Sequence, residues 1–273
     1  MEKYAKAIKE NLEKGKVLCG IAVSLSDPAV SELVGLSGYD FVWIEGEHGA
    51  LDRKDIQQHM IGAHAGGAAA LVRLVNSEPS LVRPVMDMGP DIIGFPFINS
   101  AEDAIKAVAA CTYPPKGVRG CNPQRASYYG KMDYKSYVKN AENETLKMML
   151  IEQQQGYTNI EEIVQVEGVD IIALGPGDLS LDMGFGGDMA RPEIHKMISH
   201  AAEVCRRYNK PFIAFPSIET ESVKVWTDMG ANVLCFAQDT SFITTAISKL
   251  WPIYNKIVPL SRQHNQRCTF KEK

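Results

Sequence analysis

The sequence predicts an α/β protein folded as a single-domain (β/α)₈ TIM barrel, and three observations support this fold class. Eight short runs rich in Val, Ile and Phe recur along the 273 residues, and longer segments with helical periodicity separate them. The runs are apolar on both faces, as expected for a parallel sheet that is covered by helices. No Pro-, Gly- or Ser-rich linker divides the chain, so we expect residues 1–273 to form one domain with a short N-terminal helix and a C-terminal tail.

The predicted strands follow one another at the spacing of strand–helix units. They cover residues 17–24, 41–44, 69–75, 92–98, 148–151, 169–174, 211–215 and 232–236. Residues 41–44 are expected to fill the space between the barrel and its helices. A doubly wound open sheet is the alternative, but no G-x-G-x-x-G motif follows the first predicted strand.

Two of the predicted helices are especially clear. Residues 192–208 carry their apolar side chains in one stripe, and residues 100–111 begin with Ser100 as a cap and Glu102 and Asp103 in the first turn. The charged N-terminus predicts a short amphipathic helix. The connection formed by residues 113–145 is unusually long. It is either functional or involved in assembly, or it is a surface excursion with a short helix.

Composition narrows the class of protein. Hydrophobic residues make up 45% and charged residues 23%, and the net charge of −4 gives no electrostatic basis for a nucleic-acid partner. No apolar run approaches the roughly 20 residues of a membrane helix, and the N-terminus is too charged for a signal peptide. Six scattered cysteines without a C-x-x-C pair fit reduced thiols. We therefore expect a cytoplasmic protein without a membrane partner.

Polar residues gather at the predicted carboxyl ends of the strands, where (β/α)₈ barrels carry their chemistry. Residues 45–48 (Glu-Gly-Glu-His) follow the second strand, and Arg73 lies near the end of the third. Glu152 closes the fifth strand, and Asp178 follows the sixth within Gly-Pro-Gly-Asp-Leu-Ser. Each has a structural explanation alone, such as turn capping for Asp178. Their coincidence at one barrel mouth predicts a common site.

The residue types predict the chemistry of that site. Two carboxylates without a Cys–His set favour a hard divalent ion such as Mg²⁺ or Mn²⁺, with positions left for water and a chelating substrate. An arginine stabilises an oxyanion, and a histidine moves a proton near neutral pH. Backbone amides near Gly177 and Asp178 are available to a carboxylate. These parts suit a 2-oxo acid that binds the metal and is enolised.

These motifs resemble those of the HpcH/HpaI aldolases, which are metal-dependent pyruvate-type aldolases. The resemblance extends over most of the chain, from about residue 17 to about residue 250. The matching segments are Ile44-Glu45-Gly46-Glu47-His48, Val72-Arg73, Tyr113-Pro114-Pro115-x-Gly117-x-Arg119-Gly120, Ile151-Glu152, Gly175-Pro176-x-Asp178-Leu179-Ser180 and Asp239-Thr240. Their order and spacing together carry the resemblance.

The resemblance implies a role for each site residue. Glu152 and Asp178 would hold the divalent metal, Mg²⁺ or Mn²⁺, with Co²⁺ as a further candidate. Arg73 would bind the substrate and stabilise the pyruvate enolate, and amides near Gly177 and Asp178 would receive the pyruvate carboxylate. His48 would belong to the acid–base apparatus. The resemblance also implies a homo-oligomer, a trimer or hexamer, whose last helix is exchanged between subunits.

The implied reaction is reversible cleavage of a 4-hydroxy-2-oxo acid into pyruvate, or a close analogue, and an aldehyde. The metal would act as a Lewis acid on the keto oxygen. Two residues depart from the family pattern. Glu45 stands where the family usually has an Asp that pairs with the histidine, so we expect Glu45 to orient His48. Leu150 stands where the family often has Gln and can make no hydrogen bond.

Three alternatives stay open. A Schiff-base aldolase needs a lysine near the carboxyl end of a strand, but Lys147 is predicted at the start of its strand. A citrate lyase β-like enzyme acting on acyl-CoA would share the metal carboxylates and the arginine. A barrel that binds the metal without turnover would share them too. The sequence does not identify the acceptor aldehyde.

Overall fold

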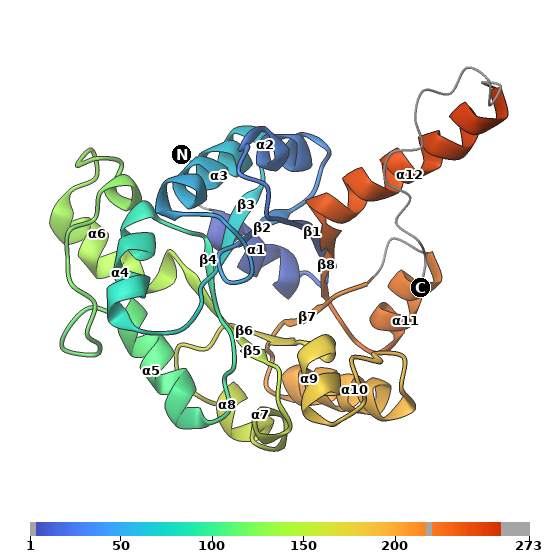
Figure 1. Cartoon of the computed structure of the whole chain (residues 1–273). Coiled ribbons are helices and arrows are strands. Elements are labelled where there is room, and N and C mark those ends of the chain that lie inside the picture. The colour runs from blue at the N-terminus through green and yellow to red at the C-terminus, as the bar shows by residue number, and fades with distance from the viewer. Residues whose placement is uncertain (1–3, 217–219, 258–273) are drawn as a thin grey trace.

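The computed structural model describes residues 4–216 and 220–257, and it contains a closed barrel of eight parallel strands in chain order (Figure 1). The strands are β1 (Leu18–Val23), β2 (Phe41–Glu45), β3 (Ala69–Arg73), β4 (Ile92–Phe95), β5 (Leu146–Ile151), β6 (Ile171–Leu174), β7 (Phe212–Ala214) and β8 (Val233–Gln238). Strand β8 pairs with β1 and closes the barrel. The predicted fold class and all eight predicted strands are confirmed, with boundaries that differ by a few residues.

The helices lie outside the strands, and most of them pack around the outer face of the barrel (Figure 1). They are α1 (Tyr4–Glu13), α2 (Ala29–Leu36), α3 (Arg53–Gly66), α4 (Pro79–Met88), α5 (Ala101–Cys111), α6 (Tyr134–Asn140), α7 (Gln154–Thr158), α8 (Ile160–Val164), α9 (Pro176–Asp182), α10 (Pro192–Arg207), α11 (Thr220–Asp228) and α12 (Asp239–Ile257). Two 3₁₀ turns, Arg125–Ser127 and Ala141–Asn143, flank α6. The predicted C-terminal tail lies outside the described residues.

The core has two layers because side chains alternate along each strand. On β2, Phe41 and Trp43 point into the barrel, whereas Val42 and Ile44 pack between the barrel and the helices. The expectation that all four fill the outer layer is therefore wrong for the two aromatic residues. Helix α1 packs its buried Ala5 and Ile8 with the inner layer.

Local sequence signals fix where the helices begin. The Ser100 side chain accepts a hydrogen bond from the Asp103 amide, as predicted for the start of α5. Asp52 accepts from the amides of Lys54 and Asp55 and forms a capping box at the start of α3. The predicted apolar stripe of α10 is buried.

The long connection formed by residues 113–145 is anchored on α4 by two buried arginines. Arg119 Nη2 lies 3.0 Å from both the Met86 carbonyl oxygen and Asp87 Oδ1. Arg125 Nη1 donates to the Met88 carbonyl at 3.0 Å. The segment contains the short helix α6, and these contacts hold the segment against α4.

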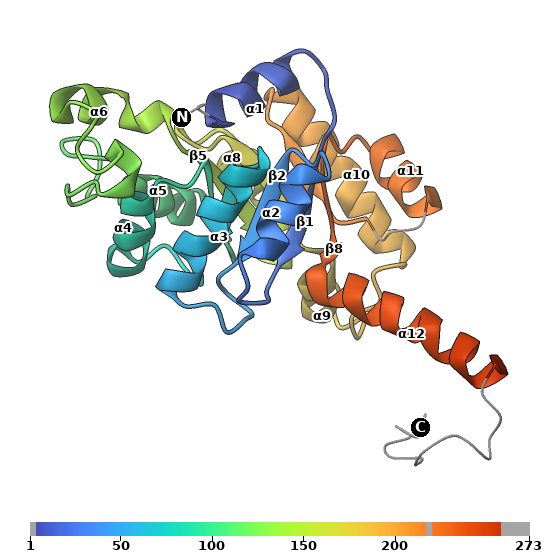
Figure 2. The same cartoon turned by 90° about the horizontal axis from the view of Figure 1, so that it is seen from above.

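Helix α12 extends away from the barrel in both views (Figures 1 and 2). Its first residue, Asp239, is buried and accepts hydrogen bonds from the Ser24 amide, the Ser24 hydroxyl and the Leu25 amide. Further along, its exposed apolar side chains are Ile243, Ile247, Leu250, Trp251, Ile253, Tyr254 and Ile257. Within residues 4–216 and 220–257, no helix is long and apolar enough to span a membrane.

Candidate active site

A cavity of about 770 Å³ opens at the carboxyl ends of the strands. Five predicted site residues line it: Glu45, Arg73, Glu152, Gly177 and Asp178. They come from β2, from β3, from the position directly after β5 and from the first turn of α9. The sixth predicted residue, His48, lies in the loop after β2 beside the cavity lining, and its side chain is 57% exposed. The structure thus brings the predicted residues to one barrel mouth.

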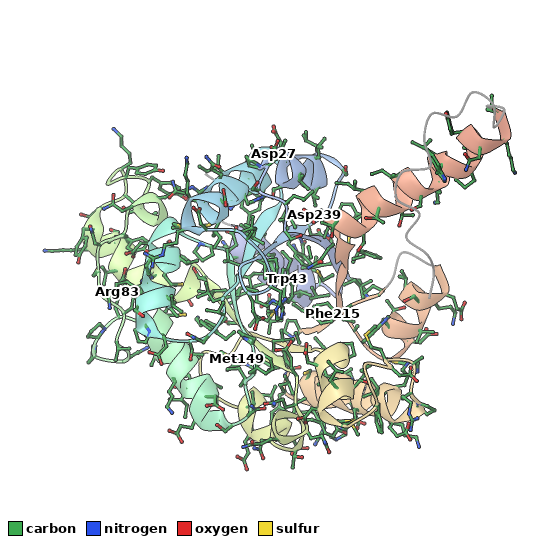
Figure 3. All side chains as sticks on the ribbon, in the orientation of Figure 1. Asp27, Trp43, Arg83, Met149, Phe215 and Asp239 are labelled. Atoms are coloured by element: carbon green, nitrogen blue, oxygen red, sulfur yellow. The ribbon has the colours of Figure 1, made fainter. Side chains whose placement is uncertain are left out.

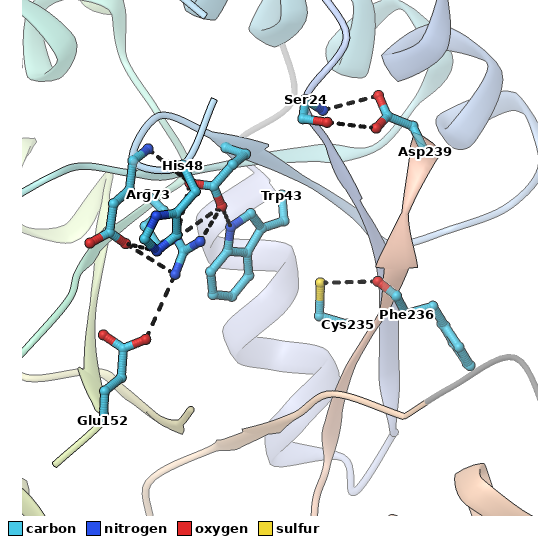
Figure 4. A network of polar contacts seen from close by, with 10 residues as sticks. Ser24, Trp43, His48, Arg73, Glu152, Cys235, Phe236 and Asp239 are labelled. Atoms are coloured by element: carbon cyan, nitrogen blue, oxygen red, sulfur yellow. Dashed lines mark hydrogen bonds and ion pairs between the residues drawn. The ribbon is translucent and has the colours of Figure 1, made fainter. Parts of the chain in front are cut away.

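The Arg73 guanidinium is the centre of this site (Figure 4). Its Nε donates to both carboxylate oxygens of Glu45, at 2.9 and 3.2 Å, and its Nη2 also contacts Glu45. Its Nη1 lies 3.1 Å from Glu47 Oε2 and 3.8 Å from Glu152 Oε1. The Trp43 ring centroid lies 5.6 Å from the guanidinium carbon. These contacts fix the orientation of Arg73.

Glu45 holds Arg73 from inside the barrel. Its carboxylate accepts hydrogen bonds from the amides of Glu47 and His48, at 2.8 and 2.9 Å. Burial works to raise the pKa of Glu45, but the hydrogen bonds and charge of Arg73, helped by these two amides, lower it below its usual range. The carboxylate therefore stabilises the fold above its unfolded-state pKa, and this contribution is lost as the pH falls through the lowered folded-state pKa.

The predicted contact between the Glu45 carboxylate and the His48 ring is wrong. His48 Nε2 lies 3.5 Å from Glu47 Oε2, whereas Glu45 binds only the backbone amide of His48. The reason is the alternation along β2, which directs Glu45 to the inner face shared with Phe41 and Trp43. Glu47 is the carboxylate beside the ring.

Glu152 is buried at the end of β5. Its Oε2 accepts a hydrogen bond from the Phe97 amide at 3.2 Å, and Phe97 adopts a positive φ of 53° that only a minority of non-glycine residues show. A Cβ on Gly175 would lie 2.7 Å from Glu152 Cγ, so this position requires glycine. The backbone on both sides is therefore shaped around this carboxylate.

The carboxylates of the mouth repel one another. Burial raises the pKa of Glu152 to about 7, and the charges of Glu47 and Asp178 add to this effect. The Phe97 amide and the Arg73 guanidinium oppose it. Burial also raises the pKa of Glu47, again with a contribution from Asp178. A cation between Glu152 and Asp178 would relieve this repulsion.

The donor set fits a hard divalent ion. Glu152 and Asp178 present carboxylate oxygens, and Mg²⁺ in proteins is commonly held by one or two carboxylates with water and substrate in the other positions. Across the described part of the chain, no group of three or more His, Cys, Asp or Glu side chains forms a metal site. Two carboxylates would fill only part of the coordination shell of such an ion and would leave positions open for a substrate.

The floor of the cavity is apolar. It consists of inward-facing residues from five strands or the loops that follow them: Ala22, Trp43, Leu150, Phe215 and Cys235. Trp43 and Phe215 lie edge to face with ring centroids 5.6 Å apart, near the middle of the molecule (Figure 3). Leu150 is buried here, so the polar residue expected from the family pattern is replaced by hydrocarbon.

Lys147 lies at the opposite end of β5 from Glu152. Its Nζ is 3.3 Å from Asp170 Oδ2, and the described lining of the cavity contains no lysine. This arrangement disfavours the Schiff-base alternative.

Sequence reasoning missed the residues that close the cavity on its outer side. Met189, His195 and Trp226 come from the connection before α10, from α10 itself and from α11. Their positions depend on how helices pack over the mouth, and no short motif in the sequence marks them.

Comparison with known proteins identifies the family of this chain. The sequence model of the HpcH/HpaI aldolase/citrate lyase family matches residues 19–243. The chain is 29% identical over 255 residues to the 5-keto-4-deoxy-D-glucarate aldolases of Citrobacter koseri and Escherichia coli O157:H7, covering 93% of this chain and 98% of each relative.

Solved structures show the same fold. An HpcH/HpaI aldolase from Desulfitobacterium hafniense aligns with a TM-score of 0.85 at 24% identity, over 94% of this chain and 99% of that one. The citrate synthase SbnG aligns with a TM-score of 0.81 at 27% identity, over 91% and 97%. The family match spans most of the barrel, including every residue of the site described above. The chain therefore belongs to the HpcH/HpaI aldolase/citrate lyase family and is a carbon–carbon lyase.

Proposed function

We propose that this protein is a divalent-metal-dependent aldolase of the cytoplasm, which reversibly cleaves a 4-hydroxy-2-oxo acid into pyruvate, or a close analogue, and an aldehyde. The observation that carries the proposal is the Arg73 guanidinium, which Glu45 and Glu47 hold beside the Glu152 and Asp178 carboxylates. A fixed positive charge then lies next to the two carboxylates that we propose as metal ligands.

Each residue has a chemical task in the proposed reaction. Glu152 and Asp178 would hold Mg²⁺ or Mn²⁺, and the bound ion would supply Lewis acidity at the 2-oxo group. Arg73 stabilises the negative charge that develops on the enolate oxygen. The amides of Gly177 and Asp178 lie in the first turn of α9, where backbone N–H groups have no helical partner and attract a carboxylate.

In the proposed reaction His48 accepts the proton of the 4-hydroxyl group, and Glu47 is the carboxylate partner of its ring. In the cleavage direction His48 removes this proton, the C3–C4 bond breaks, and its electron pair becomes the enolate of pyruvate. Protonation at C3 completes the methyl group. The 3.5 Å approach of Glu47 Oε2 to His48 Nε2 gives the ring a carboxylate partner.

With Mg²⁺ or Mn²⁺ present, the protein is expected to exchange the methyl protons of pyruvate with deuterated solvent, because enolisation requires no aldehyde. Loss of the methyl signal in the proton NMR spectrum measures the rate. Metal without protein and protein with EDTA are the controls. Exchange no faster than in these controls would contradict the proposal that the protein enolises pyruvate.

A second candidate is a citrate-forming or citrate-cleaving reaction, which the 27% identity to the citrate synthase SbnG favours. Enolisation of an acyl thioester would use the same metal and arginine. Assays of citrate formation from acetyl-CoA and oxaloacetate distinguish it from the aldolase reaction. Metal binding without either activity would instead indicate a barrel that has lost turnover.

We further propose that the protein is a trimer or hexamer in which α12 packs on a neighbouring subunit. The exposed apolar side chains of this projecting helix would be covered by such an exchange. The double variant Leu250→Glu with Trp251→Glu is expected to shift the mass in solution toward that of the 30.1 kDa chain. Light scattering after size exclusion measures this mass.

The matched control for this experiment is Lys249→Glu, which changes the charge of a neighbouring exposed position on the same helix. It is expected to leave the assembly intact. A wild-type protein that is monomeric at micromolar concentration would contradict the exchange of α12.

A further inference from the structure

We propose that the aldehyde partner is uncharged and has an apolar body, so that the 4-hydroxy-2-oxo acid carries its only carboxylate at C1. This inference rests on the proposed aldolase function and names its substrate class. It departs from what the relatives' name describes, because a glucarate derivative carries carboxylates at both ends.

The cavity is divided into a charged half and an apolar half. Arg73, Glu152 and Asp178 form the charged half, where the 2-oxo acid would bind. Trp43 lies near both halves, because its ring centroid is 5.6 Å from the Arg73 guanidinium carbon and 5.6 Å from the Phe215 ring centroid, with the two rings edge to face. A molecule that extends from the reacting carbon past Trp43 therefore meets hydrocarbon.

Met189 borders the carboxylate site directly. A Cβ on Gly177 would have Met189 Sδ as its nearest neighbour, at 3.9 Å, so the thioether lies against the loop that carries Asp178. Met189 is nevertheless 52% exposed. Trp226 on α11 lines the same cavity and is partly buried. An apolar occupant would remove further surface of both side chains from water, which is favourable.

The charges of the cavity also exclude a second carboxylate. Among the described lining residues, Arg73 is the single lysine or arginine, and it already contacts Glu45, Glu47 and Glu152. Asp188 adds a further acid beside Met189. A carboxylate on the aldehyde would be desolvated without a cation and would face these acids, so it would be selected against.

The remaining polar groups of the lining are compatible with an uncharged aldehyde. His195 and Gln238 line the cavity and can exchange hydrogen bonds with a hydroxyl or carbonyl group. They tolerate a polar substituent without requiring a charge.

The inference is tested with pyruvate as the donor and with pairs of aldehydes. One member of each pair carries a carboxylate and the other does not. Butanal is compared with succinate semialdehyde, and benzaldehyde with 4-carboxybenzaldehyde, all with the wild-type protein and Mg²⁺ or Mn²⁺. We expect kcat/KM to be about tenfold or more higher for the uncharged member of each pair. Equal values, or a preference for the carboxylated aldehydes, would overturn the inference.

Pyruvate proton exchange, measured on the same preparations, separates this inference from the proposed function. If exchange is present and the carboxylated aldehydes are preferred, only the substrate class is wrong. If exchange is absent, the aldolase function itself is wrong.

A gain of charge at Met189 is the second test. Met189→Arg is expected to raise kcat/KM for succinate semialdehyde relative to butanal by about tenfold, and Met189→Gln is expected to change this ratio less. Leu181→Arg is the matched control, because Leu181 lies on α9, is 58% exposed and does not line the cavity. If the ratio of kcat/KM for succinate semialdehyde to that for butanal is the same in Met189→Arg as in the wild-type protein, Met189 does not border the aldehyde.

Discussion

Replacement of Glu152 by Gln is expected to lower the affinity for Mn²⁺ about 100-fold or more and to abolish pyruvate proton exchange, while the barrel stays folded. The variant loses one of the two carboxylates that we propose as metal ligands. Even the loss of a residue that only hydrogen-bonds to a metal ligand commonly lowers metal affinity or activity 10- to 100-fold. The fold is expected to tolerate the change because Gln removes a buried charge whose burial raises the pKa of Glu152 to about 7. Titration calorimetry with Mn²⁺ measures affinity, and thermal unfolding measures stability.

The control for this experiment is Asp170→Asn at the opposite end of the barrel. Asp170 pairs with Lys147 and Lys9, each at 3.3 Å, so its replacement is expected to lower the unfolding temperature. Mn²⁺ affinity should not change in this variant. If Glu152→Gln retains the wild-type affinity, Glu152 is not a metal ligand.

Replacement of Arg73 by Lys is expected to slow pyruvate proton exchange by about 10²- to 10³-fold, the usual effect of removing a group that stabilises an oxyanion. A lysine keeps the charge but cannot bind Glu45 with two nitrogens while contacting Glu47 and Glu152. We also expect a lower unfolding temperature, because the buried Glu45 carboxylate loses hydrogen bonds. The exchange assay and thermal unfolding report the two effects separately.

Arg119→Lys provides the matched comparison. Arg119 is 2% exposed and contacts Asp87 and the rings of Tyr113 and Tyr137, away from the barrel mouth. This variant is expected to lose stability and to keep its exchange rate per folded molecule. A similar loss of exchange in both variants would indicate that Arg73 acts through stability alone.

The barrel was predictable because its signals are local. Each strand is a short run of apolar residues between turns, and the order of runs and helical segments allows few topologies. The site residues followed from the same reasoning, since the carboxyl ends of all strands meet at one mouth. Glu45, Arg73, Glu152 and Asp178 could therefore be grouped before the structure was known.

Other parts of the site depend on relations that the sequence does not show. The partner of His48 is Glu47 because β2 directs Glu45 inward, and this register became clear only in the closed barrel. Met189 and Trp226 reach the cavity through the packing of α10 and α11 over the mouth. The apolar pattern of α12 is the same whether it covers its own barrel or another one, so the expected exchange of this helix rested on the family resemblance and not on the pattern.

The crowding of Glu45, Glu47, Glu152 and Asp178 around one guanidinium has a kinetic consequence. Before a cation binds, the acidic side chains at the barrel mouth repel pyruvate, which is itself an anion. In the proposed reaction the cation would therefore bind before pyruvate. The same arrangement of charges that supports the proposed ligands would thus also set the order in which the cation and the 2-oxo acid bind.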